Sequence, residues 1–242
     1  MDVELKIQLG LYGNTAYLSP IRLDVGSIGS TSSWAGSYHI LAMGRHYDDY
    51  IMTGALMSLP PISGFPVAHP YQQLTGKIRA AGVTGNIGEC VAALFARRYL
   101  SANLNQIAHI KPHRPFHRNM SPDFLMNIGG AISSVFSKVV PKGFPSTWPN
   151  WWPVESKARN TDNASHGGRR DALKQLLAYW SVILNSRPSE VGYGLIAVFK
   201  YQPTRQLQIS LMLPKNQPAL LTELKKGYKN REAILRTFLH EC

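Results

Sequence analysis

The sequence predicts an α/β fold in which a mixed central sheet is flanked by helices and preceded by a β-rich N-terminal extension. From about residue 84, segments with helical periodicity alternate with short apolar segments of period two. Residues 1 to 70 instead combine glycine, serine, proline and aromatic side chains with short alternating segments. We therefore divide the 242 residues into an extension or small β-rich subdomain over 1–70 and a larger domain over 71–242.

The first elements of the larger domain are predicted to be a helix and two strands. Residues 84–98 are predicted to form a helix, because apolar side chains recur there at helical spacing on one face. The segments 106–110 and 123–128 are predicted strands, joined by a basic turn over 111–118. Residues 129–150 contain too much glycine, serine and proline to predict a regular element.

The second half of the domain repeats this alternation. In the predicted strand over 154–158, Glu155 and Lys157 alternate with other residues, so both project from one side. A helix over 168–184, two strands over 194–201 and 206–213, and a basic helix over about 219–239 complete the chain. The order helix, strand, strand, strand, helix, strand, strand, helix is typical of a mixed sheet with flanking helices.

Composition restricts the classes of function. The chain has 26 Lys and Arg against 14 Asp and Glu, a net charge of +12 that favours a polyanionic partner such as nucleic acid. Two cysteines, Cys90 and Cys242, provide neither a disulfide scaffold nor a cysteine zinc site. The acidic start has no long apolar stretch behind it, and no apolar run approaches the ~18 residues of a membrane span. We therefore expect a cytoplasmic protein without membrane association.

Two carboxylates and a lysine form the candidate catalytic group. Asp123 opens one predicted strand, and Glu155 and Lys157 share a side of the next. If these strands are neighbours, the two carboxylates lie at cross-strand distance and repel each other unless a cation is shared between them. Oxygen-only ligands beside a phosphate substrate suit Mg²⁺, with Mn²⁺ as a plausible substitute.

These residues and their order resemble a known family. Glu89 in the first helix, the Pro122-Asp123 pair, the Glu155-Ser156-Lys157 triplet, and Gln175 with Tyr179 in the next helix are similar to the motifs of the PD-(D/E)XK nuclease superfamily. The Gln-x-x-x-Tyr spacing resembles the branch with the RecB and lambda-exonuclease types. The resemblance covers about residues 75–213 and implies a restriction-endonuclease-like fold.

The resemblance also implies roles for individual residues. Asp123, Glu155 and Glu89 would bind the metal, with Glu89 acting directly or through water. Lys157 would orient or activate the attacking water, and Gln175 would position the substrate or groups of the metal site. Tyr179 would support its helix, although a half-buried packing aromatic explains this residue equally well. The implied activity is Mg²⁺-dependent hydrolysis of DNA phosphodiester bonds, with RNA not excluded, in restriction, repair or antiphage defence.

Basic residues around the motif predict a nucleic-acid track. Such residues bind the phosphate backbone without reading its sequence. The predicted contacts are Lys111, Arg114, Arg118, Arg159, Arg169, Arg170 and Lys174. Three tryptophans over 148–152 stack on unpaired bases in one interpretation, whereas core packing is expected for at least one of them.

Two other functional classes stay open. In one, the chain is a catalytically silent nucleic-acid-binding subunit of a larger helicase, nuclease or defence complex. In the other, it is a structural interaction protein whose function resides in residues 1–70, which are also the candidate surface for a protein partner or a homodimer. Metal-dependent cleavage separates the nuclease from both alternatives.

Overall fold

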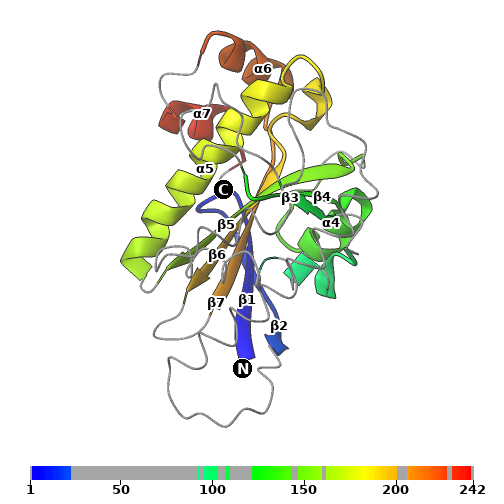
Figure 1. Ribbon diagram of the computed structural model, residues 1–242, viewed down its shortest axis with the longest axis vertical. Coiled ribbons are helices and arrows are strands. Elements are labelled where there is room, and N and C mark those ends of the chain that lie inside the picture. The colour runs from blue at the N-terminus through cyan, green and yellow to red at the C-terminus, as the bar shows by residue number, and fades with distance from the viewer. Residues whose placement is uncertain are drawn as a thin grey trace.

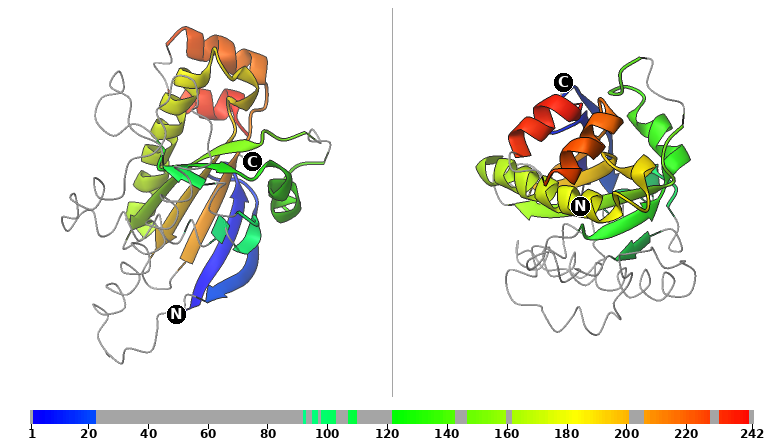
Figure 2. Two further views of the ribbon diagram at one scale, coloured as in Figure 1. Left: turned by 45° about the vertical axis from the view of Figure 1, so that its right-hand side comes forward. Right: turned by 90° about the horizontal axis from the view of Figure 1, so that it is seen from above.

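A seven-stranded mixed sheet forms the centre of the molecule (Figure 1). A computed structural model describes residues 2–22, 92, 95–96, 98–102, 107–109, 122–142, 147–159, 162–200, 206–227 and 231–240. In this part of the chain the strand order across the sheet is β2-β1-β7-β6-β5-β4-β3. Helices flank both faces of the sheet, as the two views of Figure 2 show. The predicted α/β class with a mixed sheet and flanking helices is therefore confirmed.

The pairing of the strands follows from their connections. Strands β3, β4 and β5 pair antiparallel in sequence order, and so do β6 and β7. The helix α5 connects β5 to β6, which are parallel, because a parallel pair requires a long crossover connection. The strands are β1 (Asp2–Leu9), β2 (Thr15–Arg22), β3 (Ile107–His109), β4 (Phe124–Asn127), β5 (Trp151–Arg159), β6 (Gly194–Lys200) and β7 (Gln206–Met212).

Each face of the sheet has its own apolar core. Alternate residues of the strands point to opposite faces, so the sheet contributes a separate set of side chains to each core. One core includes Ile132 and Phe136 of α4 (Gly129–Phe136), together with Phe124, Val154 and other strand residues. The other contains residues of α5 (Asp162–Ile183), α6 (Gln217–Lys225) and α7 (Arg231–Phe238). We call the second face the α5 face.

The predicted first helix is described only in part. Residues 92, 95, 96, 98 and 99 are helical, and Ala92, Phe95 and Ala96 are buried in the same core as α4. Phe95 also stacks against Tyr99, with ring centroids 5.4 Å apart. In this part of the segment, the structure agrees with the helix predicted over 84–98.

Two helical predictions need correction. Residues 129–150 were predicted to lack a regular element, yet α4 forms there because burial of Ile132 and Phe136 offsets the low helix propensity of its glycines and serines. The basic helix predicted over about 219–239 is two helices, α6 and α7. Gly227 has a φ of +73°, a left-handed conformation that terminates α6. Asn216 caps the start of α6 by accepting a hydrogen bond from the backbone N–H of Ala219 at 3.1 Å.

The N-terminal strands belong to the same sheet as the larger domain. β1 pairs parallel with β7 along its length and antiparallel with β2. Its odd-numbered side chains from Val3 to Leu9 are buried in the core that α4 covers. Residues 2–22 of the predicted extension are therefore an integral part of the sheet, because burying this apolar stripe requires the other strands. The predicted boundary near residue 70 falls outside the described residues.

The junction between β4 and α4 provides a test of the fold. A Cβ atom at Gly129 would lie 2.5 Å from the carbonyl oxygen of Pro149, whereas a Cβ at Gly130 would meet nothing within 4 Å. We expect Gly129→Ala to lower the free energy of unfolding by about 1–3 kcal/mol, since the backbone at 149–150 must shift. Gly130→Ala should raise it by up to about 1 kcal/mol through helix propensity. Urea denaturation of both variants checks this, and equal effects would contradict the packing of α4 against residues 149–150.

Candidate functional site

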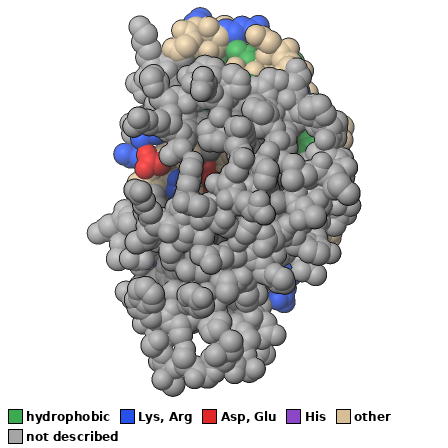
Figure 3. Space-filling model, viewed as in Figure 1, with side chains coloured by type: hydrophobic (Ala, Val, Ile, Leu, Met, Phe, Trp, Pro, Cys, Tyr) green, Lys and Arg blue, Asp and Glu red, His purple; other side chains and the backbone are tan. Residues whose placement is uncertain are grey.

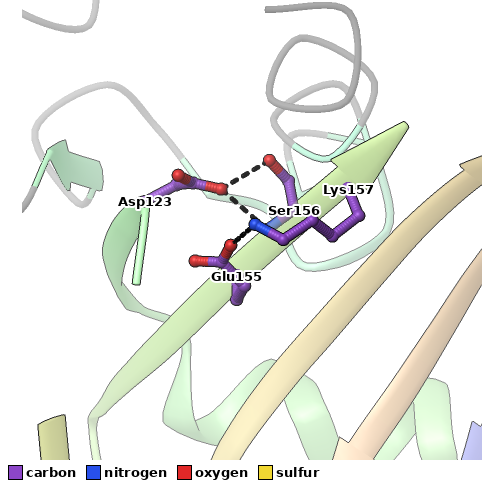
Figure 4. Close-up of polar contacts among 4 residues, drawn as sticks. All are labelled: Asp123, Glu155, Ser156 and Lys157. Atoms are coloured by element: carbon purple, nitrogen blue, oxygen red, sulfur yellow. Dashed lines mark hydrogen bonds and ion pairs between the residues drawn. The ribbon is translucent and has the colours of Figure 1, made fainter. Parts of the chain in front are cut away.

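The antiparallel pairing of β4 and β5 brings the predicted motif together. Phe124 pairs with Val154, so Asp123, directly before β4, lies beside Glu155 and Ser156 at the end of this ladder. Figure 4 shows Asp123 and Glu155 next to each other, with Ser156 and Lys157 completing the group. The strands thus gather residues that are about thirty positions apart in the sequence.

Ser156 fixes the Asp123 carboxylate through two hydrogen bonds. The backbone N–H of Ser156 donates to Oδ2 of Asp123 at 2.8 Å, and its hydroxyl donates to the same oxygen at 2.7 Å (Figure 4). Hydrogen bonds to an ionised acceptor are short and strong. Because both bonds go to one oxygen, the orientation of the carboxylate is defined and its Oδ1 has no hydrogen-bond donor among the described residues.

Glu155 is a buried acid with incomplete hydrogen bonding. Its side chain is 0% exposed, and Lys157 donates a hydrogen bond within an ion pair to Oε1. The second oxygen, Oε2, has no hydrogen-bond partner within the part of the chain that the structure describes. A buried polar atom in this state costs free energy, which a functional role or a bound ion can explain.

The surroundings of Glu155 make its charged form less favourable than in water. Burial, followed by the negative charge of Asp123, raises the pKa of Glu155 well above its ordinary value of 4.5. The ammonium group of Lys157 and, more weakly, the backbone of Asp123 act in the opposite direction without cancelling these effects. With both carboxylates ionised, the site would carry two negative charges against the single positive charge of Lys157.

The carboxylate oxygens of Asp123 and Glu155 suit a small, hard divalent cation. Mg²⁺ is usually held by one or two carboxylates and keeps several further positions for water and substrate phosphate. Asp123 and Glu155 provide two such carboxylates, and Oε2 of Glu155 is an oxygen that lacks a described donor. Within the described ranges, no group of three or more His, Cys, Asp or Glu side chains gathers to hold a metal. The predicted third acid, Glu89, is not among the described residues.

The two predicted residues of α5 differ in their surroundings. Gln175 is half-buried, and no described hydrogen bond connects it to Asp123 or Glu155. Tyr179 is fully buried in the core of the α5 face. Burial, with a smaller contribution from the charge of Glu190, raises the pKa of Tyr179. The burial of Tyr179 fits packing of the helix, which was one of its two predicted roles.

Arg169 is a correction to the predicted nucleic-acid track. Its side chain is only 7% exposed, and its guanidinium donates a hydrogen bond to the carbonyl oxygen of Leu11 at 2.9 Å. The guanidinium also lies over the ring of Tyr12, 5.7 Å from its centroid. Arg169 therefore links α5 to the turn after β1, because its own side chain is buried and bonded to that turn.

The other predicted basic contacts have varied positions. Arg170 is exposed on α5, and Lys174 forms an ion pair with Asp171 at 2.7 Å. Arg159 is the last residue of β5, and its side chain is not described. Lys111, Arg114 and Arg118 fall outside the described residues altogether. Of the three tryptophans, Trp152 is fully buried in the core, as expected for at least one of them.

Ser156 belongs to the candidate site, although the sequence did not predict it as a site residue. It occupies the middle of the Glu155-Ser156-Lys157 triplet, and alternation along the strand directs it away from both charged neighbours. Only the pairing of β4 with β5 shows that its hydroxyl and N–H meet Asp123. The sequence does show a hydroxyl residue between Glu155 and Lys157. This observation indicates a contact with Asp123 only when the register of β4 against β5 is known.

Comparison with protein-family models, with curated proteins and with solved structures finds no match to this chain. Among the helices of the described ranges, none combines the length and apolar character that crossing a membrane requires.

Proposed function

We propose that the protein is a Mg²⁺-dependent nuclease that hydrolyses phosphodiester bonds of DNA. The observation that carries this proposal is the buried carboxylate of Glu155, whose Oε2 has no described hydrogen-bond partner, beside Asp123 and Lys157. If the Glu155–Lys157 ion pair were purely structural, Asp123 beside it would not stabilise it, because the charge of Asp123 raises the pKa of Glu155. A site that binds a cation explains the arrangement.

The topology of the sheet supports a restriction-endonuclease-like fold as part of this proposal. Strands β3, β4 and β5, helix α5, and strands β6 and β7 occur in the order that the family resemblance implies, with α4 as an additional helix between β4 and β5. Asp123 lies directly before β4, Glu155 lies on its antiparallel partner β5, and Gln175 and Tyr179 lie on the helix that follows. The net charge of +12 is consistent with a nucleic-acid substrate.

The residues of the site suit hydrolysis by water. Asp123 and Glu155 would hold Mg²⁺, which supplies stabilisation of the negative charge that develops on the phosphate oxygens. Lys157, 18% exposed and ion-paired with Glu155, is positioned to orient the attacking water or to balance developing charge. Ser156 holds Asp123 in one orientation, so its carboxylate needs no rearrangement when a cation and substrate arrive.

The decisive experiment is a cleavage assay with purified protein on linear duplex, circular duplex and single-stranded DNA. We expect cutting with Mg²⁺ or Mn²⁺ and none with EDTA. If DNA binds but no metal or substrate gives cleavage, the protein is instead a silent nucleic-acid-binding subunit. If DNA neither binds nor is cut, a structural role becomes the better explanation.

Ser156→Ala tests whether this serine positions the catalytic carboxylate. The variant loses the hydroxyl bond to Asp123 but keeps the backbone bond, so we expect kcat to fall about tenfold, from a loss of roughly 1.5 kcal/mol, with KM nearly unchanged. Ser156→Thr retains the hydroxyl and should restore most of the rate. A loss of thermal stability in Ser156→Ala without any change in kcat or in Mg²⁺ affinity would show that the hydroxyl is only structural.

A further inference from the structure

A strip of polar side chains crosses the sheet from the candidate site to its β2 edge. Strand register places Lys157 of β5 beside Val198 of β6, then Gln208 of β7, Lys6 of β1 and Tyr17 of β2. Paired residues project to the same face, and Val198 belongs to the core of the α5 face. Lys157, Gln208, Lys6 and Tyr17 therefore share that face, and we call these four residues the polar strip.

Tyr17, at the end of the strip away from the site, is its most exposed member. α5 packs over β5 and β6 at one end, where Lys157 is 18% exposed. Gln208 and Lys6 are half-buried, and Tyr17 is 66% exposed at the other end. Two residues beyond Gln208 on β7 and beyond Lys6 on β1, Ser210 and Gln8 are buried. The accessible surface therefore ends on that side of the strip. On the opposite side of the strip, Lys200 is half-buried and Glu4 is exposed. Nε2 of Gln206 donates a hydrogen bond to Oε2 of Glu4 at 3.5 Å.

The chemistry of the strip matches an unpaired DNA strand. Five neighbouring strands spaced about 4.8 Å apart span roughly 19 Å, enough for several nucleotides of extended backbone. Lys6 provides positive charge along this path, and Gln208 provides a neutral hydrogen-bonding group that already donates to Gln8. At the site end, Lys157 is ion-paired with Glu155. Tyr17 is one of two large exposed aromatic residues in the described part of the chain. Its ring can stack on a base only if the base is not already stacked within a duplex.

We infer that the polar strip binds an unpaired DNA strand and leads it to Asp123 and Glu155. This inference rests on the proposed nuclease function and adds the form of its substrate. The path differs from the predicted track along the start of α5, where Arg169 is buried. It uses β1 and β2 instead, so it gives these N-terminal strands a role in substrate binding.

Binding of fluorescent 20-nucleotide DNA to Asp123→Asn protein, followed by anisotropy, tests the inference without cleavage. Tyr17→Ala in this background should weaken single-strand binding by roughly 5- to 100-fold, and Tyr17→Phe should not. Lys6→Gln should weaken it several-fold and lower the slope of log affinity against log salt by about one. Lys138→Gln and Lys225→Gln are matched controls, because Lys138, in the turn after α4, and Lys225, at the end of α6, are exposed lysines outside the strands of the strip. Basic side chains over α6 are visible at the top of Figure 3.

Each outcome decides the inference separately from the proposed function. Loss of single-strand affinity in Tyr17→Ala and Lys6→Gln, with both control lysine variants unchanged, supports the strip. Unchanged affinity in the two strip variants overturns it, even if the wild-type protein cuts DNA. Tighter binding of duplex than of single strands overturns it as well. If the wild-type protein fails to cut while the strip variants lose affinity, the nuclease proposal fails and the binding surface stands.

Discussion

Asp123→Asn is expected to reduce DNA cleavage by about 10³-fold or more while leaving the fold intact. The asparagine keeps an oxygen that can accept both hydrogen bonds from Ser156, so the β4–β5 ladder should be retained. It loses the negative charge that would bind the divalent cation, an interaction worth several kcal/mol in the transition state. Initial rates on linear DNA at saturating Mg²⁺, together with the melting temperature of the variant, measure the two effects separately.

Asp171→Asn is the matched control for this experiment. Asp171 lies on α5 and forms an exposed i,i+3 ion pair with Lys174, so its removal should change stability by no more than about 1 kcal/mol. Its effect on cleavage should be small, because it is not part of the group around Glu155. An active Asp123→Asn enzyme with kcat within a few-fold of the wild-type value would refute the proposed role of Asp123. Equal losses in both variants would indicate a general loss of charge or folding.

The sequence predicted the central elements because their periodicities are strong. The segment 154–158 alternates strictly, and Leu173, Leu176, Leu177 and Trp180 recur at helical spacing, so a strand and a helix were predicted there. Both elements form, but β5 begins at Trp151 and α5 at Asp162, earlier than predicted. α4 was missed because tertiary burial of two apolar residues overrides its poor propensity. The position of β1 could not be predicted either, because its pairing with β7 is a contact between residues about 200 positions apart.

The candidate site was predictable in its residues and less so in its contacts. The motif spacing identified Asp123, Glu155 and Lys157, and the structure brings all three together. Asp123 and Glu155 were predicted as a simple cross-strand pair. In the structure, Asp123 accepts hydrogen bonds from Ser156, and these bonds depend on how β4 and β5 are aligned. Arg169 was predicted to contact nucleic acid, but its guanidinium bonds to a backbone carbonyl oxygen of the protein. The charge of an arginine alone does not reveal which of these partners it has. The spacing of residues in the sequence therefore identifies candidate site residues, whereas the pairing of the strands determines which groups they contact.

The affinity for Mg²⁺ is expected to rise steeply with pH because a proton competes for Glu155. Burial and the neighbouring Asp123 raise the pKa of Glu155 well above 4.5, so the metal-free site holds a proton over a range above that value. A cation can bind only after this proton leaves. Below the raised pKa, the apparent affinity should therefore increase up to about tenfold for each pH unit, and it should level off above that pKa.

The same linkage determines how stability depends on pH. Because the folded-state pKa of Glu155 lies above the ordinary 4.5, its contribution to the stability of the metal-free protein is complete below about pH 4.5. This contribution is lost as the pH rises through the raised pKa. Mg²⁺ binding restores stability in that upper range, so the increase in melting temperature caused by Mg²⁺ should grow with pH.

Titration calorimetry in two buffers of different ionisation enthalpy should show close to one proton released per Mg²⁺ at a pH below the raised value. Glu155→Gln should lose both the proton release and the pH dependence, since its amide does not titrate. Glu223→Gln should keep both, because Glu223 is on α6 at a partly exposed ion pair away from the site. A Mg²⁺ affinity that stays constant between pH 4.5 and 8 in the wild-type protein would show that Glu155 does not bind the cation.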